Sequence, residues 1–263
     1  MTTLALLALS AVTILAIMVA LWLASLRLED AGIVDIAWGP IFVAIALLGF
    51  LLGGGWQGRR VLVLAMIGLW GLRLGWHIWR RNRGRGEDPR YAKWRRENGD
   101  SWWWRSLFKV FLLQGVVLWV VALPIQLIMS MPGPERFVVW DAVGELVWGA
   151  GFLFEAIADA QLQAFKDDRE RTGVLDTGVW AFTRHPNYFG EAVLWWGLWA
   201  VALAVPWGWA TVVSPVLITL LLRYVSGVPM TEALLEGREG WEEYARRTNI
   251  FVPGPRRATG RPS

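Results

Sequence analysis

Long uncharged hydrophobic runs alternate with short charged segments along this chain. Each run is close to the roughly 20 apolar residues with which an α-helix crosses the hydrocarbon core of a bilayer. The first run has no basic segment before it and is longer than the core of a signal peptide, so we expect a retained helix. The pattern predicts an all-α polytopic membrane protein with about seven transmembrane helices, at about 2–25, 33–53, 61–79, 108–130, 138–162, 189–206 and 208–226.

Basic residues accumulate in the loop after the third run, in the segment 166–171 and in the C-terminal tail. Because Lys and Arg mark cytoplasmic loops, these three segments are assigned to the cytoplasmic side. An odd number of spans then puts the N-terminus outside and the C-terminus in the cytoplasm. Arg59 and Arg60 fall on the outer side and count mildly against this orientation. We expect an integral protein of a bacterial inner membrane.

Composition narrows the class of protein further. Of the 263 residues, 55% are hydrophobic and 18% are charged, against about 25% charged in an average soluble protein. Without cysteine, the chain has no disulfide, thiolate metal site or cysteine nucleophile, and we predict no metal site. The net charge of +4 lies beside membrane spans, which favours anchoring to membrane lipid over nucleic-acid binding. We predict one domain over 1–254, a disordered tail over 255–263 and no obligatory protein partner.

A few ionisable residues lie inside the predicted spans, where insertion costs roughly 2.5–3.5 kcal/mol each. Asp35 begins the second span, and Arg73 and His77 lie one turn apart on the third. Together they can form a catalytic cluster of acid and base. The alternative is a structural ion pair between Asp35 and Arg73, with a histidine bonded to the backbone.

Glu155, Asp159 and Lys166 follow helical spacing along the fifth predicted span. Such a stripe can line a polar cavity in the inner half of the membrane. The alternative is a network of salt bridges between helices.

The segment "TRHPNYFGE" at 183–191 precedes and opens an apolar run. Pro186 suits the first turn of a helix, whose free amides and positive dipole end attract phosphate. Polar side chains able to bind a pyrophosphate or ribose surround this turn: Arg184, His185, Asn187, Tyr188 and Glu191. The alternative, a polar loop with a helix cap, leaves the carboxylate of Glu191 within the span unexplained.

The basic loop "NRGRGEDPRY" at 82–91 has two glycines that let a ligand approach the backbone, and arginines that can bind phosphate. We include Asn82, Arg85 and Tyr91 among the cofactor-binding candidates. The signal is weak by itself because basic loops beside membranes are common. The sequence contains no GxGxxG, Walker A or HExxH motif.

"GVWAFTRHPNYFGE" and the downstream "LRYVSGVPMTEALLEGREGWEEYARRTNIFVPGP" resemble the C-terminal domain of the steroid 5α-reductase superfamily, most closely its bacterial reductase-like branch. Sterol reductases and isoprenylcysteine carboxyl methyltransferases are more distant relatives. The resemblance covers most of the chain and is strongest over about 155–254. The "RHPNYFGE" element does not by itself separate reductase from methyltransferase.

The resemblance implies a seven-helix enzyme that binds NADPH from the cytoplasmic side and reduces an activated carbon–carbon double bond in a lipophilic ketone. It implies cofactor contacts for residues at matching positions: Asn82, Arg85, Asp159, Lys166, Asn187, Glu191 and Arg223.

This chain departs from the steroid reductases, which carry a Gln-Glu pair on span two and a Tyr on span three. Here span two offers only Asp35, and span three has no Tyr. We expect Asp35 with His77 or Arg73 to act as proton donor to the carbonyl. Two alternatives remain: an S-adenosylmethionine-dependent methyltransferase on the same scaffold, and a non-catalytic lipid-binding or transport protein whose intramembrane charges form a relay or gate.

Overall fold

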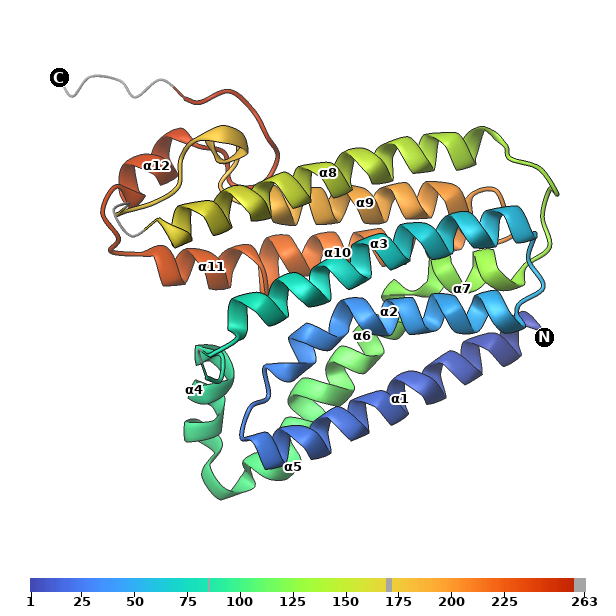
Figure 1. Ribbon diagram of the computed structural model, residues 1–263, viewed down its shortest axis with the longest axis horizontal. Coiled ribbons are helices and arrows are strands. Elements are labelled where there is room, and N and C mark those ends of the chain that lie inside the picture. The colour runs from blue at the N-terminus through green and yellow to red at the C-terminus, as the bar shows by residue number, and fades with distance from the viewer. Residues whose placement is uncertain (85, 169–171, 258–263) are drawn as a thin grey trace. The chain divides into compact units, whose positions relative to one another are not determined.

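A computed structural model describes residues 1–84, 86–168 and 172–257 of the protein (Figure 1). Within these ranges every regular element is a helix, and the one extended pairing is an isolated parallel bridge between Thr183 and Asn249. The chain forms two compact units, one of residues 1–141 with 202–214, the other of 142–201 with 215–263. The all-α expectation is therefore confirmed.

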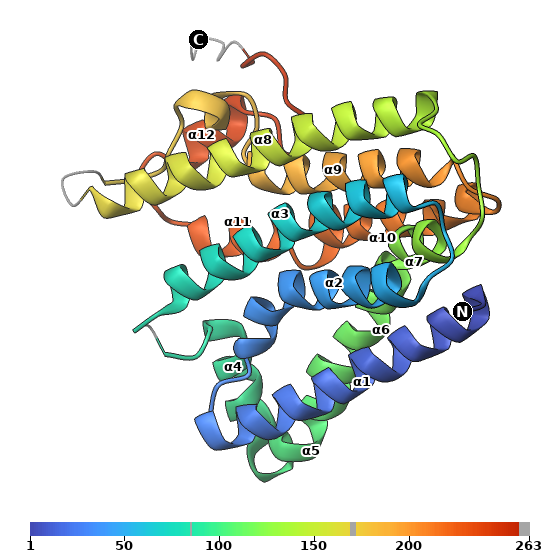
Figure 2. The ribbon, with the colours of Figure 1, turned by 45° about the vertical axis from the view of Figure 1, so that its right-hand side comes forward.

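The first unit contains most of the long apolar helices. Its elements are α1 (Thr3–Leu28), α2 (Ile33–Leu52), α3 (Gln57–Asn82), α4 (Pro89–Asn98), η1 (Gly99–Ser101), α5 (Trp102–Ser106), the π-helix η2 (Leu107–Leu112), α6 (Leu113–Val121), α7 (Leu123–Ser130) and η4 (Gly208–Val212). The short helix α4 lies at the end of the unit where α1 finishes and α2 begins (Figures 1 and 2).

Helices α2 and α3 approach each other through glycine. A Cβ atom on Gly39 would lie 2.1 Å from the carbonyl oxygen of Gly71, and one on Gly75 would lie 2.9 Å from the ring of Pro40. A larger side chain at Gly39 or Gly71 would force the two backbones apart. This contact determines which face of α3 is turned toward α2.

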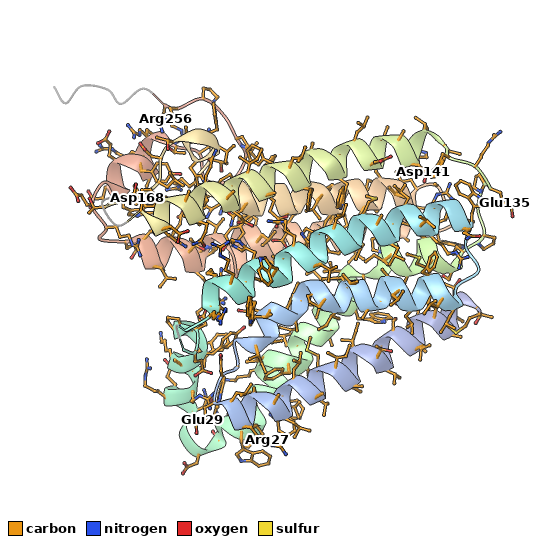
Figure 3. The ribbon with its side chains drawn as sticks, in the orientation of Figure 1. Arg27, Glu29, Glu135, Asp141, Asp168 and Arg256 are labelled. Carbon is orange, nitrogen blue, oxygen red and sulfur yellow. The ribbon has the colours of Figure 1, made fainter. Side chains whose placement is uncertain are left out.

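Charged groups in the first unit gather at the ends of the long helices. Arg27 and Glu29 lie at one end, and Glu135 and Asp141 lie at the other (Figure 3). Arg59 is buried against Asp141, with its Nε 2.6 Å from one carboxylate oxygen and its Nη2 2.9 Å from the other. Arg60 donates to the carbonyl oxygens of Phe50 and Gly53. Both arginines thus have hydrogen-bond partners within the protein. These partners explain why two cations lie at the end of the helices that was assigned to the outer side.

The second unit is built around α8 (Val139–Asp167) and α9 (Pro186–Ala202), with η3 (Gly178–Ala181), α10 (Val213–Leu220), the π-helix η5 (Leu221–Val225), α11 (Val228–Leu235) and α12 (Trp241–Arg247). α8 and α9 run side by side (Figures 1 and 2). A Cβ atom on Gly190 would lie 2.7 Å from the carbonyl oxygen of Gly151, so these two glycines allow the close packing. It brings the N-terminal end of α9 against the polar stripe of α8.

In the part of the chain that the structure describes, five helices or helical stretches are long and apolar enough to cross a membrane: Thr3–Leu28, Ile33–Leu52, Gln57–Asn82, Pro89–Val121 and Gly208–Leu235. Several of them leave large apolar side chains exposed, as helices facing lipid do: Leu4, Leu15, Leu51, Leu69 and Val116. The sequence predicted seven spans. α9 has 17 residues, short for a span, and α8 carries five carboxylates, which lower its hydropathy.

The predicted disordered tail falls mostly outside the described residues, since 258–263 are not described. In the part that is described, Arg256 donates to the carbonyl oxygen of Ala181 over 3.2 Å. Residues 255–257 therefore continue along the second unit.

Candidate functional site

Asp35 is the centre of a polar cluster in the first unit. Its Oδ1 accepts a hydrogen bond from the Tyr91 hydroxyl over 2.8 Å, and its Oδ2 lies 2.8 Å from Arg90 Nη2. Gln114 Nε2 lies 3.2 Å from the Tyr91 oxygen, and Gln114 Oε1 accepts from Trp38 Nε1 over 2.5 Å. We call these five residues the Asp35 cluster. Its members come from α2, α4 and α6.

The start of α4 explains how Arg90 and Tyr91 reach Asp35. Asp88 caps the helix by accepting from the Arg90 amide over 2.9 Å, and Pro89 occupies the first turn. Glu87 accepts from the Ala31 amide over 2.9 Å, which ties the loop before α4 to the loop before α2. Consecutive residues of α4 are thereby held over the first turn of α2.

Asp88 shares the guanidinium of Arg90 with Asp35, because Arg90 Nε lies 2.9 Å from Asp88 Oδ1. Burial alone would raise the pKa of the Asp88 carboxyl, but the hydrogen bonds and charge of Arg90 hold that pKa below its usual value. Asp88 is therefore ionised at neutral pH and keeps Arg90 in place.

Arg90 replaces Arg73 as the cation beside Asp35, which corrects the expected pairing. Gly71 and Gly75 are the residues of α3 that face α2. Arg73 lies two residues beyond Gly71, which turns it by about 200° around the helix. Arg73 and His77 are half-buried on α3, and the described contacts of Asp35 are with Arg90 and Tyr91 instead.

Tyr91 places a phenol hydroxyl beside Asp35. From the sequence, Tyr91 was expected among the cofactor contacts, and Arg90, Gln114 and Trp38 were not expected in a site. The signal available in the sequence was the Asp-Pro pair at 88–89, which predicts a new helix beginning directly before Arg90 and Tyr91. Tyr91 is buried, and its hydroxyl donates a hydrogen bond to the carboxylate of Asp35. A phenol held in this way can donate its proton to a substrate oxygen.

A second cluster lies at the N-terminus of α9, in the second unit. Asn187 Nδ2 donates to Asp159 Oδ1 over 3.4 Å, which joins α9 to α8. Asp159 is 6% exposed, and Glu155, one turn before it, is 2% exposed. The predicted stripe on α8 and the predicted motif at 183–191 thus meet.

Arg184 and His185 share a partner that the sequence reasoning missed. Glu232 Oε1 lies 3.1 Å from Arg184 Nη2 and 3.1 Å from His185 Nε2. The Tyr188 hydroxyl lies 2.9 Å from the Thr231 hydroxyl on the same helix, α11. We call Asp159, Arg184, His185, Asn187, Tyr188, Thr231 and Glu232 the Asn187 cluster. Glu232 belongs to the downstream segment that carries the family resemblance, but its spacing alone did not single it out.

Burial sets the protonation of this cluster. It lowers the pKa of His185 below its usual value of 6.5, and Glu232 offsets this effect only in part. His185 is therefore neutral at pH 7. A neutral ring that bonds the ionised Glu232 carries its proton on Nε2, which leaves Nδ1 as an acceptor.

Burial also lowers the pKa of Arg184, against the opposing effect of Glu232. Its guanidinium lies over the ring of Trp241, 5.5 Å from the ring centre, and 3.4 Å from the carbonyl oxygen of Ala245. Arg184 is therefore a cation held between α9, α11 and α12.

The other predicted cofactor contacts are distributed over both units. In the second unit, Lys166 is exposed near the end of α8, Glu191 is half-buried one turn beyond Asn187, and Arg223 lies on η5 over the ring of Tyr224. In the first unit, Asn82 ends α3 and accepts from Arg81 Nε over 3.1 Å. Arg85 lies outside the described residues.

The Asn187 cluster offers groups that can bind a nucleotide. The cation Arg184 and the positive dipole end of α9 suit phosphate oxygens, and the buried carboxylate and amide of Asp159 and Asn187 suit ribose hydroxyls or a carboxamide. Among the described residues, no group of three or more His, Asp or Glu side chains is arranged to hold a metal ion.

Both clusters lie within the part of the chain that matches a known protein family. A family model described as "Protein of unknown function (DUF1295)" matches residues 21–248. An uncharacterized protein of Schizosaccharomyces pombe is 27% identical over 204 residues, which cover 66% of this chain and 58% of the relative. This chain thus spans less than two thirds of the length of that relative. No solved structure gives a significant match.

Proposed function

The chain belongs to the DUF1295 family, and on that premise we propose that it is a membrane-embedded, NADPH-dependent reductase of an activated carbon–carbon double bond in a lipophilic ketone. The observation that carries this proposal is the Tyr91 hydroxyl held on Asp35, with Arg90 beside the carboxylate. An enone reductase needs a proton donor near the ketone oxygen, whereas methyl transfer needs none. The cluster also has too specific a set of hydrogen bonds for a simple membrane anchor.

The residues of the second unit would hold the cofactor. Arg184, His185 and the α9 amides suit the phosphates, and Asn187 with Asp159 suits the ribose or carboxamide. When bound, NADPH supplies a hydride, with its two electrons, for the β-carbon of the enone. Lys166 and Arg223 are the further cations that this unit offers to the additional phosphate.

The residues of the first unit supply the proton. In the resting structure the Tyr91 hydrogen lies toward Asp35, so the ketone oxygen has to replace Asp35 as its acceptor. As negative charge develops on that oxygen, Tyr91 donates the proton and then recovers one from water. Hydride on the β-carbon and the proton on the ketone oxygen give an enol. Transfer of a proton from water to the α-carbon, with loss of the enol proton to water, then gives the saturated ketone. Arg90 keeps Asp35 from becoming an unpaired buried charge.

The proposal includes seven spans, with α8 and α9 as the two beyond the five apolar stretches, the N-terminus outside and the C-terminus in the cytoplasm of a bacterium. Support comes from burial, since Asp141, Glu155 and Asp159 of α8 point into the protein. The chain has no cysteine, so single cysteines can report sidedness. Thr2→Cys should react with a membrane-impermeant maleimide in intact cells, and Val252→Cys should react only after lysis. The reverse pattern would contradict the orientation.

Nucleotide binding tests the function directly. We expect NADPH to copurify with the detergent-extracted protein, or to quench its tryptophan fluorescence by energy transfer when added, since the chain has 20 Trp. Progesterone serves as the enone probe, with NADPH oxidation as the signal. Binding of S-adenosylmethionine in place of NADPH would overturn the reductase in favour of the methyltransferase. Binding of neither would favour the non-catalytic class.

A further inference from the structure

We infer that Gln114 is a positioning residue that orients the Tyr91 hydroxyl. The contact is a property of the first unit, while its effect on turnover rests on the proposed function. Gln114 lies in the first turn of α6 and is half-buried. Its amide lies between Trp38 on one side and Tyr91 on the other.

The direction of the hydrogen bonds follows from the chemistry of the end groups. The indole N–H of Trp38 is a donor only, so the group of Gln114 that faces it over 2.5 Å is the amide oxygen. The amide NH₂ of Gln114 then faces Tyr91 over 3.2 Å, and this group is also a donor only. The Tyr91 oxygen must accept from it. The phenol proton is thereby directed to the remaining partner, Asp35, which is an acceptor.

The backbone before Gln114 supports this placement. The π-helix η2 ends two residues earlier, at Leu112. A π-type turn holds about one residue more than an α-turn, so it rotates everything after it by about 100° relative to an uninterrupted α-helix. The direction in which Gln114 faces Tyr91 therefore includes this rotation. π-Turns of this kind are often found at functional sites.

The chemical consequence concerns the tyrosine oxygen after proton transfer. When Tyr91 donates its proton, negative charge forms on an oxygen that already accepts a hydrogen bond from Gln114. A donor aimed at a developing charge stabilises the transition state more than the resting state. Gln114 therefore increases turnover without touching substrate or cofactor.

The test begins with a spectroscopic measurement that needs no ligand. The chain has four tyrosines, so the full-length protein labelled with ¹³C at tyrosine Cζ gives four resonances, and Tyr91→Phe assigns one of them. The Cζ shift responds to hydrogen bonds at the phenol oxygen. We expect Gln114→Met to move the Tyr91 resonance and to leave the other three in place. The matched control is Gln126→Met, since Gln126 is a buried glutamine of the same unit that bonds to Ser10 and Trp119.

Trp38→Phe is the second variant, in case Gln114→Met does not fold. It removes the donor that fixes the Gln114 amide, and it should move the same resonance. An unmoved Tyr91 resonance in whichever of these variants folds would overturn the inference.

The kinetic arm separates this inference from the proposed function. With progesterone, Gln114→Met should lower kcat by about fivefold to tenfold, as expected for loss of one hydrogen bond, with the affinity for NADPH unchanged. A moved resonance in a protein that neither binds NADPH nor reduces progesterone would contradict the reductase and leave the orientation of Tyr91 standing. A moved resonance with normal kcat would refute the positioning role alone.

Discussion

The Asp35 cluster and the Asn187 cluster use similar residue types for different purposes. In the Asp35 cluster one carboxylate has a cation on one oxygen and a phenol on the other, so the proton of Tyr91 is the movable part. In the Asn187 cluster one carboxylate, Glu232, joins a cation and a neutral imidazole at a helix N-terminus. The first arrangement suits acid catalysis, and the second suits the binding of an anion. The difference lies in where the proton and the helix dipole are, and it can be tested by removing one group from each.

Tyr91→Phe should have the largest effect, because it removes the transferable proton and little volume. We expect kcat with progesterone to fall by about 100-fold or more, a typical contribution of a general acid, while NADPH binds as before. Stopped-flow and steady-state NADPH oxidation measure kcat. Fluorescence energy transfer from tryptophan measures the binding of NADPH. Tyr224→Phe is the matched control, since Tyr224 is exposed.

A double variant sharpens this result. If Tyr91 and Asp35 act as one unit, Asp35→Asn should add little to the loss in Tyr91→Phe, since coupled residues are not additive. If the loss of kcat in the double variant equals the product of the losses in the two single variants, Asp35 has a separate role.

Asn187→Ala should weaken NADPH binding by about tenfold, as expected for loss of one or two hydrogen bonds to a ligand. The variant should remain folded, because Asn187 is half-buried and its replacement by alanine removes no core volume. Titration of NADPH into the variant measures the dissociation constant. The comparison between the two clusters would break if Asn187→Ala bound NADPH normally and lost kcat instead.

Lys166→Gln should reduce the preference for NADPH over NADH by a few-fold, because an exposed lysine contributes modestly to binding of the additional phosphate. The ratio of kcat/KM for the two cofactors is the measurement. Lys93→Gln, at an exposed lysine of α4 in the first unit, is the control and should leave the ratio unchanged. An equal change in both variants would mean that net charge, and not this site, sets the preference.

The smallest effect concerns pH. The pKa of His185 is lower in the folded protein than its usual value of 6.5, so the unfolded chain binds a proton first as the pH falls. The stability that His185 contributes is therefore complete above pH 6.5 and is lost progressively below it, down to the folded pKa. We expect the unfolding temperature of His185→Gln to depend less on pH in this window than that of the wild type. Parallel curves from calorimetry would show that His185 is not the titrating group.

Much of the fold could be predicted from the sequence because hydrophobic runs and loop charges are local signals. The apolar runs predicted helices that the structure confirms, including those at 33–53 and 61–79, which appear as α2 and α3. The number of seven spans stays a prediction, since α8 places buried carboxylates inside an otherwise apolar helix. The roles of Asp35, Arg73 and His77 in catalysis, and of all the cofactor-binding candidates, stay predictions.

What the sequence determined by itself is the helical class, the presence of helices long and apolar enough to cross a membrane, and the motif at 183–191, because each depends on residues within a few turns of one another. Tertiary structure alone decided the partner of Asp35. The close approach of Gly39 and Gly71 turned Arg73 away, and the cap at Asp88 brought Arg90 and Tyr91 over α2. It also decided the pairing of Glu232 with Arg184 and His185, across 47 residues of chain from the histidine. Helix rotation and packing set such contacts, and no spacing within a single helix encodes them.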